Sequence, residues 1–365
     1  MLNEKEKLWA IALQQSPQLG AIRARRLLRD FGSIQSIYEA DAVALAQASY
    51  IGKKAMRHIL SREGLEMAKR ELDFVEKKGI ELLLFGESNY PRRLLQIEDA
   101  PFLLYYKGSA PLDQLRTLSV VGTRKPTENG RSACERILTE IKEFSPLIIS
   151  GLAYGIDACA HRKALDLGLE TIAVLAHGLN RIYPPQHRSL AEQMLEQGGL
   201  LTEFISQNKP LACNFPMRNR IIAGLSDALW VVETGPKGGS MISAQKAIDY
   251  QRRVFALPGR WNDKLSLGCN ELIRQQTALL LTKGEQLVKK MKWSQPQRGQ
   301  QQQLFQQLSP KEQQISELLL GGQQLHYNQL LAQLSWGHSQ LIELLLQLEM
   351  RGLIKALPGK YYRLA

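Results

Sequence analysis

The sequence has little of what metal centres, membrane proteins and secreted proteins need. Its four cysteines, Cys134, Cys159, Cys213 and Cys269, lie far apart and form no CxxC pair, whereas metal-binding cysteines usually come in close pairs. We therefore expect buried free thiols. No apolar run approaches the roughly 18 to 20 residues that a membrane helix needs. The charged stretch 1–7 lacks a signal-peptide core, so we expect a cytoplasmic protein without membrane contact.

Acidic residues are outnumbered by basic ones. The 365 residues include 47 Lys and Arg against 35 Asp and Glu, which gives a net charge of +12. Such an excess favours polyanionic partners through long-range attraction, although composition alone is equally compatible with a merely basic soluble protein. Hydrophobic residues make up 44% of the chain, which is enough for packed cores. The length predicts two or three domains.

An alternation of strands and helices between residues 117 and 285 predicts an α/β domain. Helical stretches separate apolar runs at 118–121, 147–149, 172–175, 200–204, 229–232, 254–257 and 278–281. Continuous apolar strands of this kind indicate a parallel sheet that is covered on both faces. We expect an extended Rossmann-like sheet whose ligands bind beyond the carboxyl ends of its strands.

The flanking segments predict smaller modules. Residues 1–75 read as short helices, and the hairpin around Gly20 resembles a helix-hairpin-helix that lacks its second glycine, so a packing role and a DNA-contacting role both stay open. Residues 76–116 predict a connector with short strands at 80–85 and 102–106. The glutamine-rich stretch 286–309 predicts a linker.

The C-terminal segment 310–365 predicts a winged helix. Helices are expected at 312–320, 328–334 and 339–351, followed by a β-hairpin that turns at Pro358 and Gly359. Winged helices often bind duplex DNA through the third helix. That helix has little basic charge here, so we favour a structural or protein-contact role for the tail over DNA binding.

The stretch from Thr117 to Ile149 is the strongest candidate site. A buried strand ends at Val121, Gly122 allows a tight turn, and Thr127 can cap the helix that follows. A helix N-terminus after a parallel strand presents free N–H groups and a positive dipole end. With Arg124 and Lys125 beside it, this turn predicts an anion site, and Thr123 belongs to it.

A second turn, from Ser150 to Asp157, has glycines that permit close approach to a phosphate. Asp157 and His161 lie four residues apart on one helical face. They could form an acid–base pair, but we favour a structural hydrogen bond between them. Tyr183 follows the third strand, where an aromatic ring beside cations could stack a base.

A third stretch, 214–222, places Arg218, Asn219 and Arg220 in the first turn of a helix. Cations there oppose the helix dipole, so bound phosphates or a carboxylate partner would explain them. A salt bridge to Glu203 or Glu233 is the structural alternative for either arginine. Phe215 and Tyr154 are further stacking candidates.

The glycine-rich loop 235–244 is another candidate phosphate site, with Lys237 and Gly239. It resembles the PGGxGTxxE loop of nucleoside-monophosphate phosphoribohydrolases, but Ser243 stands where that motif has its catalytic glutamate. This difference argues against glycosidic hydrolysis.

Taken together, these motifs resemble the DprA/Smf (DNA-processing protein A) family. The resemblance covers the whole sheet domain in order and rests on Val121-Gly122-Thr123-Arg124, Ser150-Gly151-Leu152-Ala153-Tyr154-Gly155-Ile156-Asp157, Ala160-His161, Ile182-Tyr183-Pro184, Phe215-Pro216-Met217-Arg218-Asn219-Arg220, Pro258-Gly259 and Gly268-Cys269-Asn270. More loosely, the N-terminal helices resemble that family's SAM-like or helix-hairpin-helix domain, and the tail resembles its winged helix.

The resemblance implies a bacterial cytoplasmic protein that binds single-stranded DNA, protects incoming transforming DNA and loads the RecA recombinase. It implies a homodimer formed through the Rossmann-like domain, no enzymatic activity and no cofactor. Arg124 is the foremost DNA contact that it carries over. Where the family often has a basic residue and an asparagine after its Tyr-Pro pair, this chain has Pro185 and His187, and Arg188 is the candidate substitute.

The predicted DNA contacts are Gly122, Thr123, Arg124, Thr127, Ser150, Gly151, Tyr183, Arg188, Phe215, Arg218, Asn219, Arg220, Lys237 and Gly239. No catalytic or metal-binding residue is predicted. Two other functions remain as alternatives. One is a nucleotide-processing, phosphoribohydrolase-like Rossmann enzyme that uses Asp157, His161 or Glu233. The other is a regulator whose winged helix reads duplex DNA.

Overall fold

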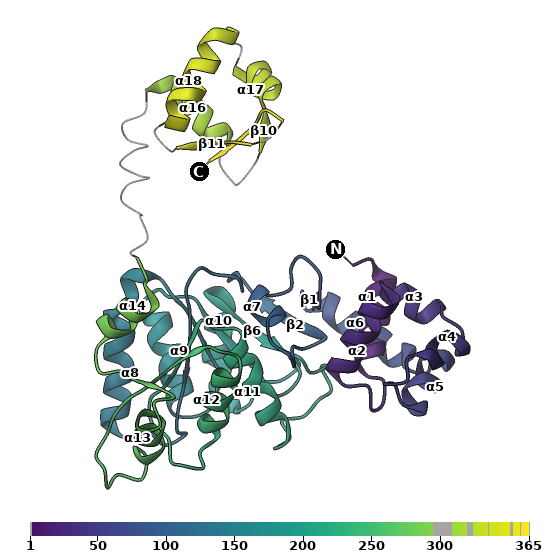
Figure 1. The fold of residues 1–365 in the computed structure, drawn as a ribbon, viewed down its shortest axis with the longest axis vertical. Helices are drawn as coiled ribbons and strands as arrows, with labels where there is room; N and C mark the ends of the chain where they lie inside the picture. Colours follow the sequence, from purple (N-terminus) through teal and green to yellow (C-terminus); the bar gives the residue numbers. More distant parts are fainter. Residues whose placement is uncertain are drawn as a thin grey trace. The chain divides into compact units, whose positions relative to one another are not determined.

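The computed structural model describes residues 2–294, 309–319, 324–334, 336–350, 353–357 and 359–364. The chain forms two compact units, Met1–Ser294 and Gln295–Ala365 (Figure 1). Within the described residues, no helix combines the length and apolarity that crossing a bilayer demands.

A nine-stranded sheet in the order β1-β2-β6-β5-β4-β3-β7-β8-β9 organises the first unit. Its strands are β1 Glu81–Leu84, β2 Leu103–Gly108, β3 Thr117–Val121, β4 Leu147–Ser150, β5 Thr171–Val174, β6 Gly198–Thr202, β7 Ala228–Val231, β8 Arg253–Ala256 and β9 Leu279–Leu280. The strands from β3 to β9 pair in parallel. Apart from β6, which adds a further parallel strand beside β5, the order β5-β4-β3-β7-β8-β9 is the 3-2-1-4-5-6 order of a Rossmann sheet. The predicted Rossmann-like core is therefore confirmed.

The sheet is mixed because the segment expected as a connector supplies its far edge. Strands β1 and β2 pair antiparallel with each other, and β2 pairs antiparallel with β6, where Tyr105 lies opposite Thr202. Both strands bury their side chains on two faces. On β1, Leu82 and Leu84 pack into the core of the N-terminal helices, whereas Leu83 packs into the core of the sheet. Segment 76–116 is thus part of the sheet rather than a tether.

Helices cover both faces of the sheet, as continuous apolar strands require. They are α7 Arg92–Leu95, α8 Glu128–Glu140, η1 Lys142–Phe144, α9 Ile156–Asp166, η2 Pro185–His187, α10 Arg188–Glu196, α11 Asn214–Gly224, α12 Gly239–Asp249, α13 Leu267–Arg274 and α14 Gly284–Met291. The helices α8, α9 and α14 pack with Leu118 and Val120 of β3 on one face. The helices α7, α11, α12 and α13 pack with Val121 on the other.

Six helices precede the sheet and lie beyond its β1–β2 edge (Figure 1). They are α1 Glu4–Gln14, α2 Ala21–Phe31, α3 Ile34–Glu39, α4 Ala42–Gln47, α5 Lys53–Ser61 and α6 Leu65–Lys77. In the turn between α1 and α2, Gly20 has a φ of +40°. On α2, Arg25 donates a hydrogen bond to the Glu98 carbonyl, and Arg26 lies 4.1 Å from the Tyr50 ring centroid. These internal contacts favour the packing role of the hairpin.

The predicted linker begins too early. Residues 284–291 form α14, because Leu287 is fully buried and packs with Leu281 and Ile137 in the core of the sheet unit. The glutamine-rich residues 295–308 lie outside the described residues.

The prediction that the four cysteines are buried free thiols is only partly right. Cys134 and Cys269 are buried, Cys159 is half-buried and Cys213 is exposed, and all four are free thiols.

The second unit has the three helices and the hairpin of a winged helix, as predicted. Its elements are α16 Pro310–Leu318, β10 Leu325–His326, α17 Tyr327–Leu334, α18 His338–Met350, β11 Ile354–Leu357 and β12 Tyr361–Leu364, with the strands in the order β10-β12-β11. Pro358 of the predicted turn lies outside the described residues, and Gly359 has a φ of +83°. The third helix, α18, contains no lysine or arginine.

Candidate functional site

A pocket opens where β3 and β7 end side by side. From β3 the chain crosses to β4 on one side, whereas β7 leads to β8 on the other, so this is the point where the strand order reverses and ligands of such sheets bind. The pocket has a volume of about 260 Å³. It is lined by Val121, Gly122, Thr123, Arg124, Ala153, Asp157, Phe215, Pro216, Arg218, Asn219, Ile222, Thr234, Gly235, Gly238, Gly239, Ser240, Ile242 and Ser243.

The turn after β3 presents Arg124 to solvent. The backbone N–H of Thr123 donates to the Glu233 carbonyl at 2.7 Å, which ties this turn to the end of β7. The guanidinium of the exposed Arg124 lies 5.4 Å from the Phe215 ring centroid. The turn therefore supplies one accessible cation beside an aromatic face.

Thr127 caps α8, as predicted, but its hydroxyl is already used. The hydroxyl accepts from the Gly130 N–H at 3.1 Å and donates to the Glu233 carboxylate, which also accepts from the Thr127 N–H at 2.9 Å. Glu233 is 3% exposed. A buried carboxylate thus occupies the N-terminus of α8, and Thr127 orders the turn instead of facing the pocket.

A buried cation, Arg218, lies beneath the turn after β4. Its Nη1 donates to the Gly151 carbonyl at 2.6 Å and to the Val174 carbonyl, and its Nε donates to the Asn219 side chain at 3.2 Å. A Cβ at Gly151 would collide with the guanidinium, so only glycine allows this approach. No hydrogen bond to a described residue uses Nη2, which leaves that nitrogen as a donor for a bound anion.

Charges around Arg218 are balanced by Asp157. The Asp157 carboxylate accepts from the N–H groups of Gly151 and Ala153 at 3.1 and 3.4 Å. Burial raises the pKa of Asp157, and the positive charge of Arg218 opposes this shift. Burial lowers the pKa of Arg218 to about 10, and Asp157 opposes that shift, so the arginine stays charged at neutral pH. Ser150, in contrast, is fully buried and donates its hydroxyl to the Val120 carbonyl at 2.6 Å.

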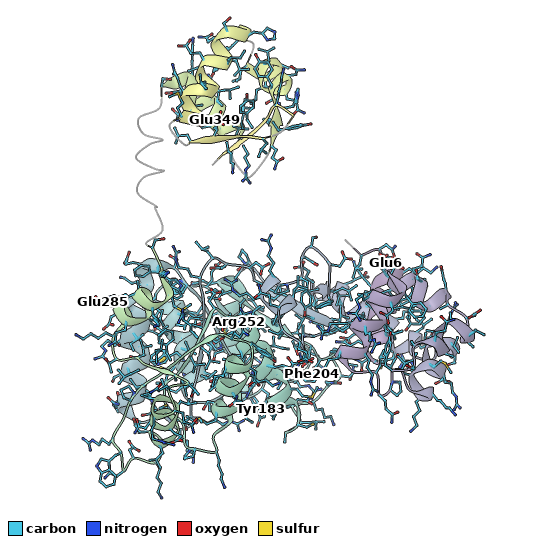
Figure 2. All side chains as sticks on the ribbon, in the orientation of Figure 1. Glu6, Tyr183, Phe204, Arg252, Glu285 and Glu349 are labelled. Atoms are coloured by element: carbon cyan, nitrogen blue, oxygen red, sulfur yellow. The ribbon has the colours of Figure 1, made fainter. Side chains whose placement is uncertain are left out.

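Aromatic rings extend the pocket toward the surface. Phe215 and Tyr183 have their ring centroids 6.1 Å apart, and the guanidinium of Arg218 lies 5.9 Å from the Phe215 centroid. Tyr183 is 42% exposed and lies on the surface of the first unit (Figure 2). A half-buried ring between two cations, with a second ring outside it, is an arrangement on which a nucleobase can stack.

The N-terminus of α12 closes the opposite side. The Asn219 side chain donates to the Gly239 carbonyl at 3.3 Å, which ties α11 to this end of α12. Gly239 is exposed, and a Cβ there would meet no other atom, so the backbone is open to a ligand. Helix N-termini of this kind favour anions. Lys237 is exposed two residues earlier.

Arg220 was predicted as a contact but lies away from the pocket. It pairs with Glu203 and donates to the Asp99 carbonyl, so the salt-bridge alternative describes it. Side chains two positions apart on a helix point to nearly opposite faces, and this separates Arg220 from Arg218. Burial raises the pKa of Glu203, and Arg220 opposes the shift.

The predicted contacts therefore fall into two sets. The pocket brings together Gly122, Thr123, Arg124, Phe215, Arg218, Asn219 and Gly239. The residues Thr127, Ser150, Gly151, Tyr183, Arg188, Arg220 and Lys237 do not line it. Of these, Arg188 is exposed at the start of α10.

The expected hydrogen bond between Asp157 and His161 is not formed. The Nδ1 atom of His161 lies 2.7 Å from the Thr171 hydroxyl instead. Burial lowers the pKa of His161 to about 3, so the ring is neutral.

Sequence reasoning also missed three cations, Arg131, Arg162 and Lys163, that line a second hollow. The sequence offered one signal for this hollow: Arg131 lies on α8, and Arg162 and Lys163 lie on the next helix, α9.

Comparisons with known proteins agree with this architecture. A family model described as DNA recombination-mediator protein A matches residues 81–292, and one described as the DprA winged helix domain matches residues 296–360. Protein Smf of Escherichia coli strain K12 is 35% identical over 342 residues, which are 89% of this chain and 87% of that protein.

Solved structures of relatives share the fold. The X-ray structure of DNA processing protein A from Streptococcus pneumoniae has a TM-score of 0.69 and 32% identity, and the match covers 77% of this chain and 97% of that one. A structure of DNA processing protein A from Helicobacter pylori, which reports the single-stranded DNA binding mode of that protein, has a TM-score of 0.53 and 29% identity, with 58% and 95% covered. The family match spans more than half of the sequence, and this chain accordingly belongs to the DNA recombination-mediator protein A (DprA/Smf) family.

Proposed function

We propose that this protein binds single-stranded DNA in the pocket at the ends of β3 and β7, without reading sequence. One observation carries the proposal: an accessible cation, a buried cation and an aromatic ring converge there, in Arg124, Arg218 and Phe215. Phosphate contacts position a strand without carrying sequence information, and stacking tolerates every base. The relative from Helicobacter pylori that binds single-stranded DNA supports the same ligand.

On this proposal the protein acts in the cytoplasm as a recombination mediator. It protects incoming single-stranded DNA from nucleases, loads the RecA recombinase onto that DNA, and works as a homodimer formed through its sheet unit. Membership of a family described as recombination mediators supports this role. A nuclease-protection assay and RecA-dependent strand exchange, each with and without the protein, test its two parts.

The competing nucleotide-processing function lacks a convergent set of catalytic groups among the described residues. The Asp157 carboxylate is held by backbone N–H groups, His161 is bonded to Thr171, and the Glu233 carboxylate is held by Thr127. Ser243, which stands at the position of the hydrolases' glutamate, is 1% exposed. We therefore propose a binding protein that is not an enzyme and needs no cofactor. Release of base or phosphate from nucleoside monophosphates would contradict this.

A competition binding assay tests the central claim. Labelled oligo-dT is bound to the full-length chain and displaced with unlabelled single-stranded or duplex DNA. We expect preference for the single strand, weaker binding by Arg124→Ala, and a salt slope of log K that is shallower by about 0.7. Arg136→Ala is the matched control, because Arg136 is exposed on α8 and pairs with Glu140 outside the pocket. Unchanged affinity in folded Arg124→Ala, or a preference for duplex, refutes the proposal.

A further inference from the structure

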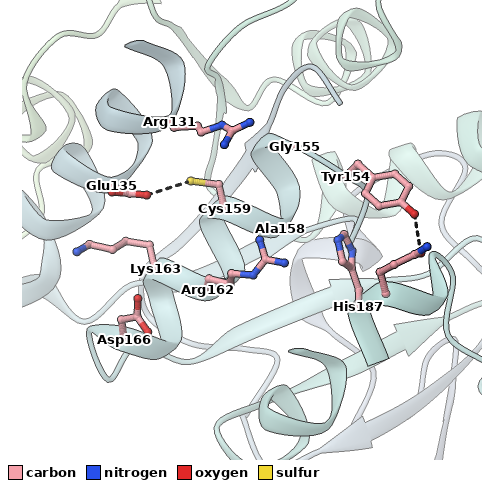
Figure 3. Close-up of a pocket in the computed structure, with 11 residues that line it drawn as sticks. Arg131, Glu135, Tyr154, Gly155, Ala158, Cys159, Arg162, Lys163, Asp166 and His187 are labelled. Atoms are coloured by element: carbon pink, nitrogen blue, oxygen red, sulfur yellow. Dashed lines mark hydrogen bonds between the residues drawn. The ribbon is translucent and has the colours of Figure 1, made fainter. Parts of the chain in front are cut away.

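A second hollow lies between α8, α9 and η2, outside the pocket just described. Its volume is about 510 Å³. It is lined by Arg131, Glu135, Tyr154, Gly155, Ala158, Cys159, Arg162, Lys163, Asp166, Gln186 and His187 (Figure 3). Of these residues only Tyr154 was a stacking candidate from the sequence, and the function proposed above makes no use of any of them.

The cations of this hollow are available. Arg131 and Arg162 are exposed, and neither guanidinium group forms an ion pair or a hydrogen bond with any part of the chain that the structure describes. They approach from facing helices, Arg131 from α8 and Arg162 from α9. Because these two guanidinium groups have no partner among the described residues, their donors are free for a bound anion.

Two acidic side chains and one lysine lie at the far end of the hollow. Glu135, Lys163 and Asp166 are on the side away from Tyr154, and the arginines lie between (Figure 3). The Glu135 carboxylate accepts from the Cys159 thiol at 3.9 Å. Because a phosphate is repelled by carboxylates, an anionic ligand would contact the arginines and end before Glu135 and Asp166.

The two cavities share a thin wall. Ala153 lines the first pocket, whereas the next two residues, Tyr154 and Gly155, line the hollow. Gly155 has a φ of +81°, and a Cβ there would collide with the backbone of Thr123 and Arg124. The turn that carries Arg124 therefore packs directly against the rim of the hollow, which places the two cavities next to each other.

Tyr154 stands on that rim as a fixed aromatic surface. Its ring is 42% exposed. Its hydroxyl donates to the Gln186 side chain at 2.6 Å, and its ring meets the His187 ring edge-on with centroids 5.1 Å apart. His187 is itself held by the Leu152 carbonyl, 2.9 Å from Nδ1. Because Gln186 and His187 fix the orientation of this exposed ring, stacking a base on it costs little side-chain conformational entropy.

From this arrangement we propose that single-stranded DNA leaving the first pocket crosses Tyr154 and enters the hollow, where Arg131 and Arg162 bind its next phosphates. The inference rests on the proposed function and extends the site from a single pocket to a track with a defined end. It places the stacking candidate Tyr154 between the two cavities and assigns phosphate contacts to two arginines that no motif pointed to.

Oligonucleotide length separates the two cavities. Binding of an oligo-dT series from about 4 to 16 nucleotides, the range of site sizes for such grooves, is measured at several salt concentrations with the full-length chain. The test variant is Arg131→Gln/Arg162→Gln. The matched control, Arg136→Gln/Lys142→Gln, removes the same charge from exposed positions of α8 and η1 outside the hollow.

We expect the test variant to bind the shortest strands like the wild type and to lose the gain in affinity that longer strands bring. Its salt slope for long strands should be shallower by about 1.4, since two phosphate contacts are lost. Glu135→Gln/Asp166→Asn should do the reverse and tighten long-strand binding. An equal loss at every length, or no loss beyond that of the control, overturns the proposal.

The rate at which Cys159 is alkylated can show whether DNA occupies the hollow. It lies in the hollow and is half-buried, whereas Cys134 and Cys269 are buried. A hydrogen bond with Cys134 lowers the pKa of the Cys159 thiol, which favours alkylation. In a Cys213→Ser background, long oligo-dT should slow iodoacetamide labelling of Cys159 several-fold, and strands too short to leave the first pocket should not.

The outcomes distinguish this inference from the proposed function. If short strands bind through Arg124 but long strands leave Cys159 labelling unchanged, the track is wrong and the pocket stands. If no strand binds, both are wrong.

Discussion

Replacing Phe215 by alanine asks whether a nucleobase stacks in the pocket. The ring is half-buried in the first turn of α11, 6.1 Å from the Tyr183 ring and 5.4 Å from the Arg124 guanidinium. It is the only aromatic side chain in the described lining of the pocket. Stacking on an aromatic side chain contributes about 1–3 kcal/mol per base. At fixed salt, Phe215→Ala should therefore bind oligo-dT about 5-fold to 150-fold more weakly.

The salt dependence shows whether that loss comes from stacking. Phe215 carries no charge, so Phe215→Ala should leave the slope of log K against log salt unchanged, whereas Arg124→Ala should make it shallower by about 0.7. Fluorescence anisotropy of a labelled strand over several salt concentrations measures both quantities. Phe215→Tyr is the matched control, because it keeps the ring, and thermal unfolding shows whether each variant is folded.

A strand that lacks bases completes the test. The wild type should lose affinity when the nucleotide in the pocket is abasic, and Phe215→Ala should not lose further, since the two changes remove the same contact. If the effects of the protein and DNA changes are simply additive, or if Phe215→Ala alters the salt slope as Arg124→Ala does, the stacking role of Phe215 is refuted.

Three further predictions concern the charges around the pocket. Arg218→Met should lower the free energy of unfolding by about 1–3 kcal/mol in chemical denaturation, because it leaves the buried Gly151 and Val174 carbonyls without their donor; a stability equal to the wild type contradicts a structural role for these hydrogen bonds. Arg220→Met should also destabilise, by removing the partner of Glu203, yet leave the oligo-dT affinity of the folded protein unchanged. Burial lowers the pKa of His161 from 6.5 to about 3. Between these two pH values the unfolded chain binds a proton at His161 that the folded chain does not, so the free energy of unfolding should fall as the pH drops from 6.5 to about 3. His161→Gln should flatten this part of the pH profile, as followed by urea midpoints.

The parallel core could be predicted because its strands are short, mostly apolar runs between helices. The run at Leu118–Val121, for example, coincides with β3, whose side chains are all buried. The antiparallel edge could not be predicted in the same way. Tyr105 of β2 pairs with Thr202 of β6, and local pattern does not reveal a partner so distant in sequence.

Predicting the site depended on which face of a helix each side chain takes. Arg218 and Arg220 look equivalent in the sequence, but one lies under the Gly151 carbonyl and the other pairs with Glu203. The helical spacing of Asp157 and His161 permits a contact, and competition from Thr171 on β5 prevents it. Local spacing limits the possible contacts, whereas packing between elements selects among them.

The carboxylate of Glu233 has a consequence for cofactor choice. In dinucleotide-binding proteins with this strand order, the pyrophosphate lies at the N-terminus of the helix after strand 1, which corresponds to β3 in this chain. Here that helix is α8, and Glu233 already accepts the Thr127 N–H at its start. A nicotinamide or flavin dinucleotide would bring its phosphates against a buried negative charge. The sheet thus has a strand order that dinucleotide-binding proteins also use, but the Glu233 carboxylate lies where the phosphates of their cofactor would bind.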